Sequence, residues 1–146
     1  METPSVLALD LEGSLISNVV SQIPRPGLFE FLKRCNELFP RIVVYSTVPE
    51  HRFREVAMLL VAEGQAPAWF AKLECVTWTG QTKNLAFIEG ADVRDVLLVD
   101  DFMEYVHPGQ EHQFVRVEHF DFPYAQSDIG LAEVLKVLVQ RTGPSN

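Results

Sequence analysis

Acidic side chains follow two separate apolar runs of the chain. Asp10 and Glu12 come directly after the run 6–9, and Asp100 and Asp101 end a second run. Short apolar runs bounded by turn residues are typical of buried strands, and open α/β sheets bind ligands at the carboxyl ends of such strands. Carboxylates that converge there repel one another unless a cation lies between them, and Mg²⁺ prefers oxygen ligands. We therefore expect a magnesium site at this edge.

Hydroxyl groups and one lysine are candidates to act with these acids. Ser46 and Thr47 end a β-branched run that starts at Arg41, and Lys83 precedes a short helical pattern. Taken alone, each feature has an ordinary explanation: paired acids start turns, hydroxyls cap helices, and lysines are solvated. Because acids or hydroxyls end three of the expected strands, the combination favours a functional site over these explanations.

The elements that must position these groups alternate between strands and helices. This alternation predicts an α/β fold with a Rossmann-like, doubly wound, mainly parallel five-stranded sheet in the order 3-2-1-4-5, covered on both faces. The first and fourth strands then flank the point where the strand order reverses, so Asp10 and Asp101 converge. The predicted strands are 6–10, 41–46, 74–78, 96–101 and 113–117, and the predicted helices are 27–39, 53–61, 83–88 and 131–139.

Length and composition exclude several classes of protein. A chain of 146 residues predicts one domain over 1–146, and 47% hydrophobic and 22% charged residues are ordinary for a globular protein. A formal net charge of −8 without a basic cluster argues against nucleic acid and anionic membranes as partners. The two cysteines lie in apolar contexts and are interpreted as reduced thiols. We expect a cytoplasmic protein with no membrane helix.

The four histidines do not have the spacing of metal ligands on a helix. We interpret them as surface or loop residues. They are His51, His107, His112 and His119.

The order of the motifs is similar to that of the haloacid-dehalogenase superfamily of phosphotransferases. The segment 10–14 resembles the first motif, Asp-x-Asp-x-Thr, and Ser46 matches the hydroxyl of the second. Lys83 matches the base of the third motif, and 100–101 match the acids of the fourth. The expected helices fill the stretches between the motifs, so we expect no cap domain and an open site.

Further segments resemble one branch of this superfamily, the NLI-interacting-factor branch. That branch includes the phosphatases of the RNA polymerase II C-terminal domain. The match covers most of the chain in patches, which are 25–32, 43–47, 82–85, 98–102 and 105–108.

The resemblance implies a role for each of the acids. Asp10 is the expected nucleophile, which attacks phosphorus and forms an aspartyl-phosphate. The expected Mg²⁺ ligands are the side chain of Asp10, the backbone carbonyl of Glu12 and the side chain of Asp101. Asp100, counted with the metal-site acids, is expected to position Lys83.

The resemblance also implies a phosphate-binding set and an acid-base group. Ser46 and Thr47 are the candidate hydroxyls for the phosphoryl group, and Lys83 balances its charge. Glu12 stands where related phosphatases have the Asp that protonates the leaving group and activates water. Ser14, in place of Thr, keeps the hydroxyl. Because Glu12 is longer than Asp by one methylene, a shifted substrate, slow turnover and a non-catalytic phospho-binding role all stay open.

The expected function is therefore a Mg²⁺-dependent phosphatase, a phosphoric monoester hydrolase that acts through Asp10. The resemblance implies a phosphorylated substrate, and a phosphoprotein as its class. One alternative is a catalytically weakened module that binds a protein partner. A small-molecule phosphomonoesterase is the other, and it differs only in its substrate.

Overall fold

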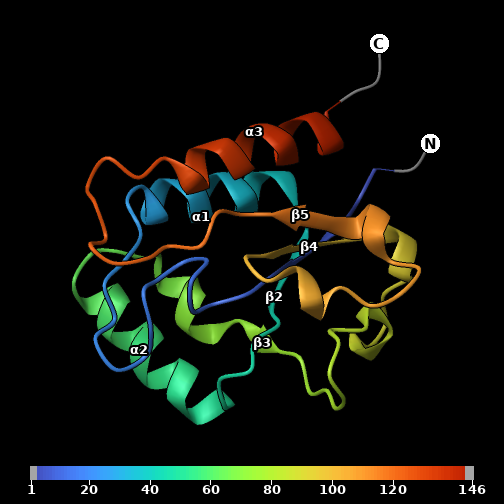
Figure 1. Ribbon diagram of the computed structural model, residues 1–146, viewed down its shortest axis with the longest axis horizontal. Helices are drawn as coiled ribbons and strands as arrows, with labels where there is room; N and C mark the ends of the chain where they lie inside the picture. The colour runs from blue at the N-terminus through green and yellow to red at the C-terminus, as the bar shows by residue number, and fades with distance from the viewer. Residues whose placement is uncertain (1–2, 144–146) are drawn as a thin grey trace.

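A parallel β-sheet lies at the centre of the computed structural model, which describes residues 3–143 (Figure 1). Five strands lie in the order β3-β2-β1-β4-β5, and every neighbouring pair is parallel. The predicted fold class and strand order are confirmed. The strands are β1 (Val6–Leu9), β2 (Arg41–Val44), β3 (Glu74–Cys75), β4 (Val96–Asp100) and β5 (Phe114–Arg116).

The two central strands, β1 and β4, consist entirely of buried residues. Leu9, the last residue of β1, is in register with Val44 of β2 and Val99 of β4. Because all the strands run in the same direction, the residues that follow them gather at one edge of the sheet. This register places the residue after β1 beside the last residue of β4.

The α-helices cover one face of the sheet. Leu7 and Leu9 of β1 belong to the larger hydrophobic cluster, which includes buried residues of all three α-helices described within residues 3–143. Periodic apolar residues produce this arrangement, since each helix turns one apolar stripe toward the strands. The helices are α1 (Leu28–Leu38), α2 (Glu50–Ala62) and α3 (Gly130–Thr142).

Short 3₁₀ helices cover the opposite face, where Val6 and Ala8 of β1 form a second cluster with Leu85. The helix predicted over 83–88 is wrong in extent, because only the single turn η2 (Leu85–Phe87) forms. The side chain of Asn84 caps this turn by accepting a hydrogen bond from the Ala86 N–H at 2.9 Å. Lys83 thus stays outside the helix.

Several predicted boundaries are also wrong, mostly at the carboxyl ends of strands. β2 ends at Val44 rather than at residue 46, and β3 ends at Cys75 rather than at residue 78. The cause at β2 is a turn, in which the Ser46 hydroxyl accepts a hydrogen bond from the Val48 N–H at 3.0 Å. This turn leads into α2, which begins three residues earlier than predicted.

Within residues 3–143, the connections between strands contain only loops, α1, α2 and short 3₁₀ helices, which are η1 (Ala68–Lys72), η2, η3 (Val93–Asp95), η4 (Met103–Tyr105) and η5 (Glu111–Gln113). No separate cap domain covers the carboxyl edge of the sheet in this part of the chain, as predicted. None of the helices described there is long and apolar enough to cross a membrane.

Candidate active site

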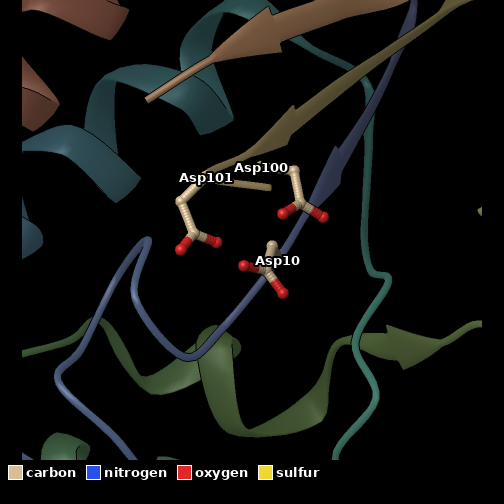
Figure 2. Close-up of side chains that lie close together, drawn as sticks. All are labelled: Asp10, Asp100 and Asp101. Carbon is tan, nitrogen blue, oxygen red and sulfur yellow. The ribbon is translucent and has the colours of Figure 1, made fainter. Parts of the chain in front are cut away.

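Three carboxylates meet at the carboxyl edge of the two central strands. Asp10 follows β1, Asp100 is the last residue of β4, and Asp101 comes next along the chain. Each has a carboxylate oxygen within 4.8 Å of the others, and Figure 2 shows the three side chains gathered around one space. Asp10 and Asp100 are 6% and 0% exposed, whereas Asp101 is half-buried. The structure brings Asp10 and Asp101 together, as the strand order predicts.

Lys83 is fully buried and joins two of these acids. Its Nζ donates hydrogen bonds to Asp10 Oδ1 at 3.0 Å and to Asp100 Oδ2 at 2.5 Å. Its own backbone N–H donates to the Tyr105 carbonyl at 2.7 Å, which anchors the segment before η2. Nζ also lies 4.7 Å from the centre of the Tyr105 ring and 5.9 Å from that of Tyr45. The structure therefore excludes the alternative in which Lys83 is an ordinary solvated lysine.

One ammonium group faces three carboxylates, and the pKa values reflect this imbalance. Burial raises the pKa of Asp10 well above its usual value; the Asp100 charge raises it further, and the opposing charge of Lys83 does not compensate. Burial also raises the pKa of Asp100. For Lys83, burial lowers the pKa, but attraction to Asp10 and Asp100 outweighs burial and the net shift is upward. Burial therefore makes the ionised forms of Asp10 and Asp100 costly, and a further positive charge at the cluster would offset that cost.

Two residues of the loop after β1 close over the acids. The Ser14 hydroxyl lies 2.7 Å from Asp10 Oδ2 and 3.3 Å from Asp101 Oδ1. Gly13 has a left-handed backbone with φ of 78°, and a Cβ there would lie 2.5 Å from Asp101 Oδ2. Only glycine allows the backbone to approach this carboxylate so closely.

A buried arginine holds the same loop from outside. Arg25 is 1% exposed, and its Nη1 donates to the carbonyls of Gly13 at 3.4 Å and Ser14 at 3.1 Å. Its Nε and Nη2 donate to the two carboxylate oxygens of Asp128 at 2.8 and 3.1 Å. Burial would raise the pKa of Asp128, but hydrogen bonds from Arg25 and the Gly130 N–H hold it below its usual value. This ion pair thus fixes the loop to the chain before α3.

The chain after β5 adds a histidine to the site. His119 Nδ1 lies 2.6 Å from Asp101 Oδ2. The neighbouring Phe120 N–H donates to the Gly13 carbonyl at 2.8 Å, so this segment packs against the loop after β1. Histidine 119 is a loop residue, as predicted, but it contacts the acid cluster.

The side chain of Glu12 is held by its own loop. Its Oε2 accepts a hydrogen bond from the Val19 N–H at 2.8 Å, and the Val19 carbonyl accepts one from Arg52 at 2.7 Å. The group of acids that lie within 4.8 Å of one another contains Asp10, Asp100 and Asp101 but not Glu12. Glu12 therefore lies next to the site residues in the sequence, but its carboxylate bonds to the loop and is not part of the acid cluster.

Ser46 and Thr47 follow β2 at the same edge of the sheet. Ser46 is half-buried and Thr47 is exposed, and both line a hollow of about 260 Å³ that Trp78 also borders. Within residues 3–143, no hydrogen bond joins either side chain to the acids or to Lys83; the Ser46 hydroxyl accepts from Val48 N–H. They lie beside an open hollow rather than within the ion-paired cluster.

Residues 5–143 match the family model of the NLI interacting factor-like phosphatases. The chain belongs to this family. The match spans nearly the whole chain, and it confirms the resemblance drawn from the separate motifs. A search of curated proteins finds no match.

The fold of this family member is similar to that of Fcp1, described as an essential RNA polymerase II CTD phosphatase. The TM-score is 0.62 at 16% sequence identity, over 95% of this chain and 50% of the Fcp1 chain. The chain thus spans about half the length of that Fcp1 structure. At this identity the similarity supports the haloacid-dehalogenase-like fold, which agrees with the predicted strand order.

Sequence reasoning missed two long-range contacts of this family member. In the sequence Arg25 is only the start of a family-like segment, yet in the structure it forms the ion pair with Asp128. His119 has no local spacing that marks it, because its contact with Asp101 joins two separate loops. One feature of the sequence could have pointed to Arg25, because its segment belongs to a family-like patch. No feature of the sequence marks His119.

Proposed function

We propose that the protein is a phosphatase that hydrolyses phosphoric monoesters with Asp10 as the nucleophile. The observation that carries this proposal is the contact of the buried Asp10 with Lys83, which also binds Asp100. Burying charged groups costs free energy, so a fold that keeps them buried often does so for a function. Strongly perturbed carboxyl groups at a sheet edge are typical of reactive sites. Membership of a phosphatase family supports the same reading.

A divalent cation fits the donor set of the cluster. Three hard carboxylate groups gather within 4.8 Å, and Lys83 contacts two of them, Asp10 and Asp100. The residues that would hold Mg²⁺ are Asp10 and Asp101 through their side chains and Glu12 through its carbonyl. Asp100 is assigned instead to position Lys83, because its two oxygens accept hydrogen bonds from Lys83 Nζ and from the Phe102 N–H. A bound Mg²⁺ would supply positive charge that neutralises the oxygens of the nucleophile and the phosphoryl group.

The reaction takes place in two displacements. A carboxylate oxygen of Asp10 forms a bond to phosphorus, while the bond from phosphorus to the ester oxygen breaks and the leaving alkoxide takes a proton. Water then attacks the aspartyl-phosphate, losing a proton as the bond to Asp10 breaks and inorganic phosphate leaves. Lys83 balances the negative charge through both steps, and the hydroxyl groups of Ser46 and Thr47 offer hydrogen bonds to the phosphoryl oxygens.

Proton transfer in this scheme belongs to Glu12, as acid in the first step and base in the second. The hydrogen bond from Val19 N–H to Glu12 Oε2 also favours a second candidate function. A carboxylate held in this way could serve the loop alone, and the protein would then be a catalytically weakened module that binds a phosphorylated protein partner.

A phosphoprotein is the substrate class that the family supports best. The carboxyl edge of the sheet is not covered by a separate domain within the described residues 3–143, which leaves space for a large substrate. Family analogy supports this class only as a hypothesis, because one fold serves many substrates. A screen across phosphopeptides, sugar phosphates and nucleotides separates this class from a small-molecule phosphomonoesterase.

The deciding experiment is hydrolysis of a generic aryl phosphate with and without Mg²⁺. The wild type is expected to turn over only with Mg²⁺, and Asp10→Asn is expected to lower kcat by at least about 10³-fold, because it removes the nucleophile. Asp92→Asn is the matched control, since Asp92 is exposed and precedes the amino end of β4. Equal turnover by the wild type and Asp10→Asn would contradict the role of Asp10 as the nucleophile. Absence of turnover by the wild type would favour the function as a binding module.

The role of Glu12 needs its own variant. Glu12→Asp restores the residue of related phosphatases. A strong rise in kcat would identify Glu12 as a handicap, whereas a fall would identify it as an adaptation to this site.

A further inference from the structure

His119 touches the acid cluster although more than half of its side chain is exposed. Its Nδ1 lies 2.6 Å from Asp101 Oδ2, and 56% of its side-chain surface is accessible. A histidine that only filled space would be buried, so packing does not explain its position. Its contact is directed to one oxygen atom.

The backbone on both sides of His119 is anchored to the site. Val117 N–H donates to the Asp100 carbonyl at 3.1 Å, and Phe120 N–H donates to the Gly13 carbonyl at 2.8 Å. Both Val117 and Phe120 are buried. The imidazole is therefore presented from a fixed segment, not from a free loop tip.

The direction of the hydrogen bond follows from the role of Asp101 as a ligand. A carboxylate that binds a cation is ionised and only accepts hydrogen bonds, so His119 Nδ1 carries the hydrogen and donates it to Asp101 Oδ2. The other oxygen, Oδ1, lies 3.3 Å from the Ser14 hydroxyl. Both oxygens of Asp101 thus have a partner from a different loop.

Resting on the proposed function, we infer that His119 is a positioning residue that fixes the Asp101 carboxylate in the orientation needed to bind the divalent cation. His119 itself does not belong to the group of ligand atoms within 4.8 Å of one another in the described residues, so it acts through Asp101. Hydrogen-bonded partners of metal ligands set ligand orientation, and their loss typically weakens metal affinity 10- to 100-fold.

The first test measures cation binding without any substrate. Binding of Mn²⁺ to the metal-freed full chain is followed by the electron paramagnetic resonance signal of the free ion. His119→Ala is expected to weaken Mn²⁺ affinity by about 10- to 100-fold. His119→Asn is expected to restore most of the affinity, because its amide N–H can donate from nearly the position of Nδ1. The matched control is His112→Ala, an exposed histidine before the amino end of β5.

Equal Mn²⁺ affinity of wild type and His119→Ala overturns the inference, and so does failure of His119→Asn to restore the affinity. A second measurement does not depend on the metal: nitrogen NMR of the metal-free wild type reports which imidazole nitrogen carries hydrogen. The contact is supported if Nδ1 carries hydrogen in the wild type and this tautomer becomes less populated in Asp101→Asn. The contact is overturned if Nδ1 of the wild type carries no hydrogen. If the wild type binds no Mn²⁺, the metal part of the proposed function fails, and the NMR result still decides the contact between His119 and Asp101.

Discussion

Two buried cations lie near the loop after β1, one bonded to its carbonyls and the other to Asp10, and their surroundings differ. Arg25 faces one carboxylate, Asp128, and uses its remaining Nη1 on the loop carbonyls. Lys83 faces Asp10 and Asp100, with Asp101 close by. The first group is balanced in charge and lowers the pKa of its acid, despite burial, whereas in the second group burial raises the pKa of Asp10 and Asp100.

This difference distinguishes the pair of Arg25 with Asp128, which is a structural ion pair, from the acid cluster around Lys83, which a further positive charge would stabilise. A balanced buried pair is satisfied within the chain, so ligands have little to add to it. A cluster with excess acid is stabilised by any cation that binds it, because the cation binds only the folded form. Mg²⁺ should therefore distinguish the two groups in stability measurements, independently of turnover.

The largest effect is expected from Lys83→Met. The substitution leaves buried carboxylates without their ammonium partner, and we expect a loss of about 3–5 kcal/mol in the free energy of unfolding without metal. Mg²⁺ should recover part of this loss, since it supplies positive charge at the same acids. Urea unfolding with a chelator or with Mg²⁺ measures both effects, and exposed Lys136→Met is the control. If Mg²⁺ restores none of the lost free energy of unfolding in Lys83→Met, the contrast between the two groups is contradicted.

The next largest effect is expected from Arg25→Met. Asp128 keeps some solvent access, with 19% of its side chain exposed, so we expect a smaller loss of about 2–3 kcal/mol. Mg²⁺ should not recover this loss, because the acid left behind lies outside the metal cluster. The exposed pair of Arg34 with Glu37 provides the control variant, Arg34→Met. Recovery by Mg²⁺ equal to that of Lys83→Met would show that the two groups do not differ as described.

The two groups should also respond to pH with opposite signs in the metal-free protein. The folded-state pKa of Asp128 is lowered by its hydrogen bonds from Arg25, which outweigh burial, so its contribution to stability is present above about pH 4 and lost as the pH falls further. Burial raises the folded-state pKa of Asp10, so its contribution is present below about pH 4 and lost as the pH rises through the raised value.

Free energies of unfolding between pH 3 and pH 8 measure these slopes. Asp128→Asn should remove the loss at low pH, and Asp10→Asn should remove the loss at higher pH and stabilise the metal-free protein at pH 7. Slopes of the same sign for both groups would contradict the contrast.

The smallest effect is expected from Ser14→Ala, because Ser14 links the two groups without a charge of its own. Its hydroxyl bonds to Asp10 and its carbonyl accepts from Arg25. Only the hydroxyl is removed, and a hydrogen bond to a charged group contributes about 1.5 kcal/mol, so we expect about a tenfold fall in kcat.

Ser17→Ala is the control for Ser14→Ala. The Ser17 hydroxyl bonds within the same loop, to Ser21 and Ile23, and does not contact the acids. Its loss should affect stability while leaving kcat near that of the wild type. An equal fall in kcat for both variants would place the effect in the loop as a whole and not in the bond to Asp10.

The strands and the meeting of the acids could be predicted from the sequence, because both depend on local patterns and one rule of topology. Apolar runs mark β1 and β4, and parallel neighbours bring their carboxyl ends to one edge, which places Asp10 beside Asp100. The positions where β2 and β3 end were less predictable. Residues 76–78, which follow β3, have strand-like side chains, and the turn at Ser46 and Val48 decides where β2 ends.

Contacts between distant segments could not be predicted in the same way. The pairing of Arg25 with Asp128 and that of His119 with Asp101 join separate loops and produce no periodicity in the sequence. The position of the Glu12 carboxylate depends on the path of the loop to Val19, which composition does not reveal. Residue types indicated which groups could react, and only packing indicated how each one is held.

The register of β1 has a consequence for how the chain acquires this site. Val6 pairs with Val96, and the bond from Lys83 to Asp10 spans 73 positions of sequence. Pairings between such distant segments form late and slowly in folding, because a long loop must first close. During synthesis, Asp10 is therefore made before Lys83 and Asp100, and it has no ion-pair partner until Lys83 follows 73 positions later.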